Sequence, residues 1–597
     1  MIIEGDTAIV AGSFAKYEII RLSDVGAANE SASRQPTNSL VAWLSPEGPQ
    51  LIPNALGEFL TASAVGIDND GKLLVGRAAK ELQVVAPDRC ATVFKRLMGT
   101  DRKVTIADRE FRAEELSSMV LKSLKEDAAE FLKQPIEEAV ITVPAYFSEL
   151  QRQATIHAGE LAGFRVRRII NEPTAAAIAY GLHELKQERV ALVFDLGGGT
   201  FDVSILDQFE STLEIRSSAG EIFLGGEDFT RSLANQILIS RQMNFEHAEL
   251  RHPLMLSRLL HECEMAKRKL STSDTTTVRF PTIEGEINEA CEQVSVSAGQ
   301  LNEWTSSLMA KTRLPLQRAL ADAGLTRHQI DEIIIVGGAT RMPQILTLLR
   351  EMFGKEPRAT LDPDLVVAMG AAIQGGLVHL NKAVTDMVVT DVAPFTLGVE
   401  IARDIAGSVK GGYFFPVISR NTTIPVSRVE QFSTIDANQT SVTVRLYQGE
   451  GRRTEDNLFL GEFALKGIPR GPAGQQVDIR FTYDLNGILE VEAVASASGT
   501  KATHVVTRHA KNMSDRQLRE ALQNLQSLKT DPRENQANRH LLKKADRLYR
   551  ELPLELKKHL ERLIHGFEEA LQLQDASVIE LNKTALEEFL NQFDEQH

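Results

Sequence analysis

The chain has 597 residues, with 66 Lys and Arg against 81 Asp and Glu, and therefore a formal net charge of −15. At ~150 residues per domain, this length predicts about four domains or fewer large ones. Apolar residues make up 43% of the chain, which excludes wholesale disorder, and the acidic balance argues against a nucleic-acid partner. Cys90, Cys263 and Cys291 are too few and too scattered for a disulfide framework or a zinc site. No apolar run approaches the ~18 residues of a membrane span and the N-terminus lacks a secretion signal, so we expect a soluble, cytoplasmic protein.

Residues 40–380 alternate short β-rich runs with helical periodicity, the pattern of an α/β domain. The clearest predicted strands are residues 139–143, 191–194 and 333–336, and the clearest predicted helices are residues 150–163, 255–270 and 343–353.

After the α/β domain the sequence pattern changes to short strands. Residues 392–506 form short β-rich runs separated by turn signals, and residues 441–447 alternate apolar with polar side chains, which predicts a β-sandwich. From Ser514, a helix-capping residue, helical periodicity continues to Phe593. The sequence therefore predicts an α/β domain, a linker, a β-sandwich and then helices.

The strongest chemical motif is FDLGGGTFDVSIL at residues 194–206. Its glycines, Gly197, Gly198 and Gly199, let backbone N–H groups converge on phosphate, and Thr200 adds a hydroxyl group. Asp195 and Asp202 flank the glycines and can hold hydrated Mg²⁺. Because β-rich sequence follows, we expect the loop to turn a hairpin rather than to open a helix. The alternative is a plain glycine hairpin without a ligand.

Three weaker motifs accompany it. Gly337 and Gly338 end a strand, with Arg341 placed to stack on a base or ribose. Gly225 and Gly226 are a similar pair. The third motif is a helical stripe of Glu264, Lys267, Arg268 and Ser271, for which spacing alone favours a solvated row of salt bridges.

Together these segments resemble the seventy-kilodalton heat-shock chaperones, the DnaK-like proteins with an actin-like ATPase domain. The resemblance runs from about Thr37 to the C-terminus and includes ITVPAYF at 141–147, INEPTAAA at 170–177, RNTTIP at 420–425 and YQGE at 447–450. The short C-terminus and the end of the linker, Thr390-Asp391, look most like the bacterial HscC branch of this family.

The resemblance implies a multi-domain fold: an α/β actin-like nucleotide-binding domain at 1–383, of which 1–36 is atypical, a linker at 384–391, a β-sandwich peptide-binding domain at 392–508 and an α-helical lid at 509–597. It implies ATP or ADP with Mg²⁺ as cofactors. The expected partners are unfolded or extended apolar peptide segments and a J-domain co-chaperone that docks near Arg168 and the apolar linker residues Met387, Val388 and Val389. Neither nucleic acid nor membrane is expected as a partner.

The family's functional residues map onto this chain by motif. The implied catalytic residues are Lys95, Glu172, Asp195, Thr200 and Asp202, with Asp195 and Asp202 holding the metal through water. The implied nucleotide-binding residues are Thr37, Asn38, Gly197, Gly198, Gly199, Gly225, Gly226, Glu264, Lys267, Arg268, Ser271, Gly337, Gly338, Arg341 and Asp364. The resemblance thus replaces the salt-bridge interpretation of the helical stripe with an adenosine clamp.

Two further sets are implied. Pro144, Arg152 and Asp391 match the switch that reports the nucleotide state to the linker. The peptide groove matches Val399, Ile401, Phe432, Val442, Val444 and Ile488, and the arch over it would be formed by Ala402 and Ile435. Many relatives have methionine where Ala402 stands and alanine where Ile435 stands. In this chain the larger side chain of the arch is therefore on the other side of the groove.

The first phosphate loop departs from the family. Where relatives read Asp-Leu-Gly-Thr before Thr37, this chain has Ser33-Arg34-Gln35-Pro36, which lacks the metal-shell carboxylate and a backbone N–H. Asp24-Val25-Gly26 resembles the missing loop but stands too early in the chain to align with Ser33–Pro36. Our hypothesis is that residues 1–36 are out-of-frame or replaced sequence.

The leading interpretation is an ATP-dependent molecular chaperone that binds and releases apolar peptide segments. The alternative is an ATPase-impaired, chaperone-like peptide-binding protein. An actin-like sugar kinase would share the glycine loops but would leave the sandwich and lid unexplained.

Overall fold

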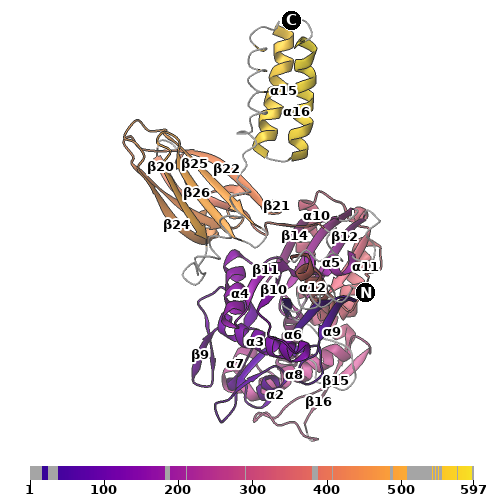
Figure 1. The fold of residues 1–597 in the computed structure, drawn as a ribbon. Helices are drawn as coiled ribbons and strands as arrows, with labels where there is room; N and C mark the ends of the chain where they lie inside the picture. Colours follow the sequence, from indigo (N-terminus) through magenta and orange to yellow (C-terminus); the bar gives the residue numbers. More distant parts are fainter. Residues whose placement is uncertain are drawn as a thin grey trace, which may run out of the picture.

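A computed structural model describes residues 17–23, 38–181, 189–209, 212–289, 291–358, 360–378, 388–405, 408–484, 488–506, 541, 545, 549, 554–573 and 576–594. Within them the fold is mixed α/β with several separate sheets (Figure 1). Among the described helices, none is both long and apolar enough to cross a membrane.

The first large sheet has the strand order β11-β10-β1-β2-β3, with β4 paired to β2. Its strands are β1 Tyr17–Ser23, β2 Asn38–Ser45, β3 Gly48–Ile52, β4 Thr61–Ala62, β10 Glu138–Val143 and β11 Arg165–Asn171. The predicted strand at 139–143 is therefore confirmed as β10. Helices α3 Ala113–Leu132 and α4 Glu149–Leu161 pack their apolar residues onto this sheet in one buried cluster.

Strand β1 is a difference from the sequence analysis, which assigned no strand to residues 17–23. It pairs parallel with β10, Arg21 opposite Thr142, and antiparallel with β2, Ser23 opposite Asn38. The run YEIIRLS contains Tyr and two Ile residues, which favour β-structure. This segment therefore forms the strand that lies between β10 and β2. Asp24 follows β1 directly in the sequence; residues 24–37, including Ser33, Pro36 and Thr37, lie outside the described part.

The second large sheet has the order β17-β12-β13-β14-β18-β21. Its strands are β12 Arg189–Leu196, β13 Phe201–Phe209, β14 Thr212–Glu221, β17 Glu332–Val336, β18 Val388–Val392 and β21 Thr423–Ile424. The predicted strands at 191–194 and 333–336 are confirmed as parts of β12 and β17. Helices α10 Ser306–Asp322 and α11 Pro343–Phe353 pack against it, and α11 matches its predicted bounds.

Helices α5 Glu172–Gly181 and α12 Val366–Val378 join the two sheets, since one buried cluster contains residues of both helices and both sheets. Their backbones approach so closely that a Cβ atom on Gly370 would lie 1.6 Å from the carbonyl oxygen of Ala175. Only glycine fits this crossing.

Smaller elements complete this α/β part. They are β5 Ala64–Ile67, β6 Leu73–Val75, β7 Cys90–Thr92, β8 Lys103–Ile106, β9 Arg109–Arg112, β15 Thr275–Arg279, β16 Gln293–Ser297, α2 Arg77–Val85, α6 Gly226–Ile239, α7 Phe245–Arg251, α8 Pro253–Lys269 and α9 Ala298–Trp304. Helix α8 confirms the predicted helix at 255–270.

The β-sandwich pairs a sheet of order β20-β19-β23-β24 with one of order β22-β25-β26-β27. The strands are β19 Leu397–Ile405, β20 Ser408–Ile418, β22 Val426–Ser433, β23 Ser441–Gln448, β24 Leu458–Lys466, β25 Gln476–Tyr483, β26 Leu489–Ala495 and β27 Lys501–Val506. The predicted strand at 441–447 is β23, and apolar residues of both sheets form one core.

Helices α15 Leu554–Leu573 and α16 Ala576–Asp594 lie side by side and share a buried cluster with Leu541 and Ala545 (Figure 1). The predicted start of the helical segment at Ser514 lies outside the described residues.

Candidate nucleotide site and interdomain contacts

The glycine motif of residues 194–206 forms the turn between β12 and β13. Asp195 lies opposite Asp202 in the antiparallel register, and the N–H of Gly197 donates to the carbonyl oxygen of Thr200 at 3.0 Å. The glycines therefore turn a hairpin, as the sequence predicts, and do not open a helix.

The first turn of α6 closes on this hairpin. The N–H of Gly226 donates to the Gly197 carbonyl oxygen at 2.9 Å, and the N–H of Glu227 donates to that of Gly198 at 2.8 Å. A Cβ atom on Gly225 would lie 2.3 Å from the Gly198 carbonyl oxygen, so a side chain is excluded there. A helix N-terminus beside a glycine turn is a favourable place for an anionic group.

The third glycine turn approaches from β17. Gly337 has φ of 82°, and a Cβ atom on it would lie 2.4 Å from the Leu196 carbonyl oxygen. Gly338 and Arg341 form the short 3-10 turn that follows. Arg341 donates to Asp362 at 2.9 Å and to Asp364 at 3.1 Å. The three glycine motifs found in the sequence thus converge in space.

The helical stripe of α8 is paired and mostly buried. Glu264 binds Lys267 and Arg268, each at 2.7 Å, and only 8% of Glu264 and 5% of Lys267 is exposed. Burial opposes ionisation of Glu264, but the two cations and their hydrogen bonds prevail and lower its pKa to about 2. Lys267 also donates to the carbonyl oxygen of Gly226, which ties the stripe to the α6 turn. Ser271 lies just beyond the C-terminal end of the helix. The four residues therefore do not form the solvent-exposed row of salt bridges that their spacing alone favours.

Buried carboxyl groups gather beside the hairpin. Lys95 donates to Glu172 at 2.9 Å. Burial raises the pKa of Asp202 well above its usual range, and Asp195 and Glu172 nearby raise it further. A divalent cation relieves this kind of repulsion, and hydrated Mg²⁺ needs only one or two carboxylates. Across the described residues, no set of three or more His, Cys, Asp or Glu is arranged so that it could hold a metal ion.

The implied switch residues meet in one network. Asn171 donates from its amide to both carboxylate oxygens of Asp391, at 2.7 and 2.8 Å, and accepts from Arg152. Arg152 also donates to the carbonyl oxygens of Ala145 and Phe147, directly after the buried Pro144. Burial lowers the pKa of Arg168, and Asp391 opposes this effect. Strand β18, which carries Asp391, extends the second sheet beside β14.

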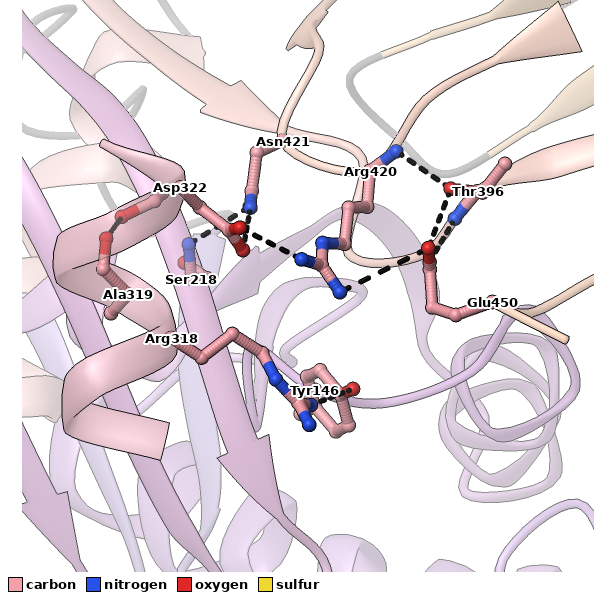
Figure 2. Close-up of polar contacts among 10 residues, drawn as sticks. Tyr146, Ser218, Arg318, Ala319, Asp322, Thr396, Arg420, Asn421 and Glu450 are labelled. Carbon is pink, nitrogen blue, oxygen red and sulfur yellow. Dashed lines mark hydrogen bonds and ion pairs between the residues drawn. The ribbon is translucent and has the colours of Figure 1, made fainter. Parts of the chain in front are cut away.

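The sandwich contacts the α/β part at places that the sequence did not indicate. Arg420 donates to Asp322 of α10 at 2.7 Å, and the side chain of Asn421 bonds both Asp322 and the backbone of Ser218 (Figure 2). At α4, the backbone N–H of Glu149 donates to Gln448 at 3.0 Å. These residues lie far apart along the chain, so no local pattern could reveal the pairs.

The implied groove residues differ in exposure. Val399 and Val444 are buried in the sandwich core, whereas Ile401, Phe432 and Val442 are partly buried against it. Ile488 is half-buried, and Ile435 is 50% exposed. Ala402 lies at an irregularity of β19, between Ile401 and Arg403. Phe415, which the sequence analysis missed, packs edge-on against Phe432 at a centroid distance of 5.2 Å.

Two sheets joined by α5 and α12, with three glycine turns meeting beside buried carboxyl groups, define a two-lobed α/β protein suited to a phosphate-bearing ligand, with a β-sandwich attached. The family model described as "Hsp70 protein" matches residues 36–597. The chain therefore belongs to the Hsp70 family.

Curated relatives agree with this assignment. The chaperone protein DnaK of Thermotoga petrophila is 39% identical over 566 residues, which cover 91% of this chain and 93% of the relative. DnaK of Thermotoga neapolitana is 40% identical over 560 residues, covering 90% and 92%. DnaK of Thermosipho melanesiensis is 38% identical over 566 residues, covering 91% and 93%. The resemblance to DnaK-like proteins is confirmed, and the HscC branch stays a prediction.

Proposed function

We propose that this protein is an ATP-dependent chaperone that binds and releases extended apolar peptide segments. The observation that carries the proposal is the connection between its two parts: Arg152, Asn171 and Asp391 tie α4 and the end of β11 to the strand that leads into the sandwich. Arg152 also holds the carbonyl groups of Ala145 and Phe147, and the N–H of Tyr146 between them donates to Asp202 of the hairpin. The DnaK relatives are named as chaperones, and ATP with Mg²⁺ is expected in this family.

In this proposal, the hairpin at Gly197–Gly199, the α6 turn at Gly225–Gly226 and the hydroxyl group of Thr200 cradle the phosphates. When bound, ATP with Mg²⁺ supplies the phosphoryl group that is transferred to water. Asp195 and Asp202 would hold the hydrated metal, and Lys95, fixed by Glu172, would neutralise negative charge that develops on the phosphate.

The nucleoside would lie between the α8 stripe and the turn at Gly337–Gly338. The ion pairs of Glu264 fix the neighbouring Lys267 and Arg268, and Asp362 and Asp364 orient the Arg341 guanidinium group. A planar guanidinium group held in this way can stack on a base. Asn38, buried at the start of β2, would line the opposite lobe together with Thr37.

The sandwich would take the peptide by strand addition and an apolar pocket lined by Ile401, Phe432, Val442 and Ile488, with Ala402 and Ile435 forming the arch. Helices α15 and α16 would form part of the lid. A J-domain co-chaperone would approach Arg168 and the β18 strand.

A second candidate, an ATPase-impaired peptide-binding protein, is favoured by one observation. The sequence before Asn38 lacks the carboxylate and threonine of the family's first phosphate loop, at Ser33 and Pro36. One lost hydrogen bond to a charged group costs about 1.5–3 kcal/mol, so weak nucleotide binding is the expected consequence.

The test is calorimetric ATP affinity and single-turnover hydrolysis on the full chain, with and without a saturating apolar peptide. Turnover that the peptide stimulates supports the first candidate, and peptide binding without turnover supports the second. Lys95→Ala should abolish ATP turnover. The matched control is Lys103→Ala, which removes an exposed side chain of β8 and should leave ATP turnover unchanged. A chain that binds neither ATP nor peptide would refute both candidates.

A further inference from the structure

Tyr146 lies at a junction between three parts of the chain. Its backbone N–H donates to Asp202 of the phosphate hairpin at 3.0 Å. Its ring packs on Phe395, just before β19, with the ring centroids 4.3 Å apart. Its hydroxyl group accepts a hydrogen bond from Arg318 of α10 at 3.3 Å (Figure 2). Hairpin, sandwich and α10 therefore meet at one residue, the hairpin through its backbone and the other two through its side chain.

Arg318 and Asp322 stand one turn apart on α10, so they share a face of the helix. Asp322 binds the sandwich through Arg420 at 2.7 Å and Asn421 at 3.0 Å. The same face of α10 thus holds the sandwich through one residue and Tyr146 through the other. Figure 2 shows both contacts side by side along this face.

The chemistry of the Arg318–Tyr146 contact is well defined. Burial raises the pKa of the Tyr146 hydroxyl group, which therefore stays neutral and has lone pairs to accept a hydrogen bond. Arg318 is partly buried and permanently charged, so its bond to the hydroxyl group is charge-assisted. The ring is then held at its hydroxyl end by Arg318 of α10 and is packed against the tilted ring of Phe395.

We propose that Arg318 is a positioning residue that couples docking of the sandwich on α10 to the phosphate hairpin through Tyr146. Docking fixes Asp322 and places Phe395 on the ring, while Arg318 holds the hydroxyl group, so the Tyr146 N–H stays aimed at Asp202. This inference rests on the proposed ATP-driven function and adds a coupling residue to it.

The test is a double-mutant cycle on the full chain with Arg318→Gln, Tyr146→Phe and both together. Tyr146→Phe keeps the ring and the backbone N–H and removes only the hydroxyl group. The first readout is hydrogen exchange of the β18 amides with saturating ATP, since β18 pairs with β14 in the docked arrangement. Each single variant should speed this exchange roughly three- to tenfold, the scale of one hydrogen bond, and the double variant should add nothing.

Two further variants separate coupling from general stability. Arg318→Lys retains a donor and should restore part of the protection, whereas Arg313→Gln, an exposed arginine on the same helix, should leave exchange unchanged. The proposal is overturned if the single variants change the exchange rate additively, if they do not change it, or if Arg313→Gln changes it as much. It is also overturned if the β18 amides of the unaltered chain show no protection from exchange.

The second readout is peptide-stimulated turnover. Arg318→Gln should reduce the stimulation of turnover by peptide several-fold, whereas Arg313→Gln should leave the stimulation unchanged. If the unaltered chain does not hydrolyse ATP, the proposed function fails, but the exchange cycle still decides whether Arg318 holds the docked state. If turnover is stimulated normally in Arg318→Gln, the coupling role alone fails.

Discussion

Tyr483 of the sandwich donates its hydroxyl hydrogen to Glu149 of α4 at 3.2 Å, and the contact buries a carboxyl group between two parts of the chain that are 334 residues apart in sequence. Gln153 donates to the other carboxylate oxygen at 2.8 Å. Burial raises the pKa of Glu149 to about 7, an effect that the hydrogen bonds and the nearby Arg152 only partly oppose. Asp484, which also faces it, raises the pKa further.

This contact predicts that docking depends on pH. Separation of the sandwich would expose Glu149 and return its pKa towards 4.5, so the docked state binds the proton more tightly. Docking is therefore strongest below about pH 4.5 and weakens as the pH rises to about 7, by up to about 3 kcal/mol at ~1.4 kcal/mol per pH unit. The docked fraction, followed by small-angle X-ray scattering with ATP from pH 5 to 8, should fall across this range.

Glu149→Gln keeps the size and the hydrogen bond from Tyr483 but cannot ionise. This variant should remove most of the pH dependence of docking. Part of the pH dependence should remain, because burial also raises the pKa of Asp391, so ionisation of this carboxyl group likewise weakens docking as the pH rises. A Glu149→Gln profile as steep as that of the unaltered chain would contradict the assignment.

The second prediction concerns Gly225. Gly225→Ala places a Cβ atom 2.3 Å from the Gly198 carbonyl oxygen, so the hairpin and the α6 turn must separate. We expect a loss of nucleotide affinity of tenfold or more, or ~1.4 kcal/mol and above, by calorimetry. Gly299→Ala, where the nearest atom is 3.8 Å away, is the matched control and should bind nucleotide normally. Equal affinities of the two variants would mean that the glycine contact does not shape the site.

The sequence predicts those parts of the fold whose signals are local. Helix α4 begins where Ser148 caps the N–H of Gln151, three residues away. The hairpin at Gly197–Gly199 depends on residues that are adjacent in the sequence. The Glu149–Tyr483 and Arg318–Tyr146 contacts join positions 334 and 172 residues apart, and such pairs leave no periodic trace in a single sequence. Strand β1 was missed for another reason: the resemblance was followed only from Thr37 onward, so the β-forming residues of YEIIRLS further upstream were not assigned to a strand.

The third prediction concerns the linker strand. Val388 and Val389 pair with Thr212 and Leu213 at the edge of the second sheet. Replacing both valines with aspartate introduces two charges into this strand, which is unfavourable for β-pairing and for docking. Stimulation of ATP turnover by peptide should be lost, while circular dichroism and peptide binding show that both parts stay folded. Retained stimulation would mean that the segment is a passive tether.

The fourth prediction concerns client choice. Ile435 is 50% exposed and Ala402 lies at the β19 irregularity, so the arch would be bulky on the Ile435 side. The double variant Ala402→Met with Ile435→Ala moves the bulk to the other side and should change the ranking of apolar peptides on an array. An unchanged ranking would show that these two side chains do not select clients.

The last prediction concerns the first phosphate loop. Strand β1 places a backbone between β10 and β2, so a strand is present from which a loop can start, but the residues aligned before Thr37 lack the metal-shell carboxylate. Replacing Ser33–Pro36 with Asp-Leu-Gly-Thr, after an Ile-Gly-Ile strand, should raise ATP affinity roughly ten- to a hundredfold, since one charge-assisted hydrogen bond contributes ~1.5–3 kcal/mol. Asp24→Asn tests the other possibility, because Asp24 follows β1 directly. If Asp24→Asn abolishes nucleotide binding in the unaltered chain, or if that chain already matches the restored variant in turnover, then the first loop is not missing but is supplied from farther upstream.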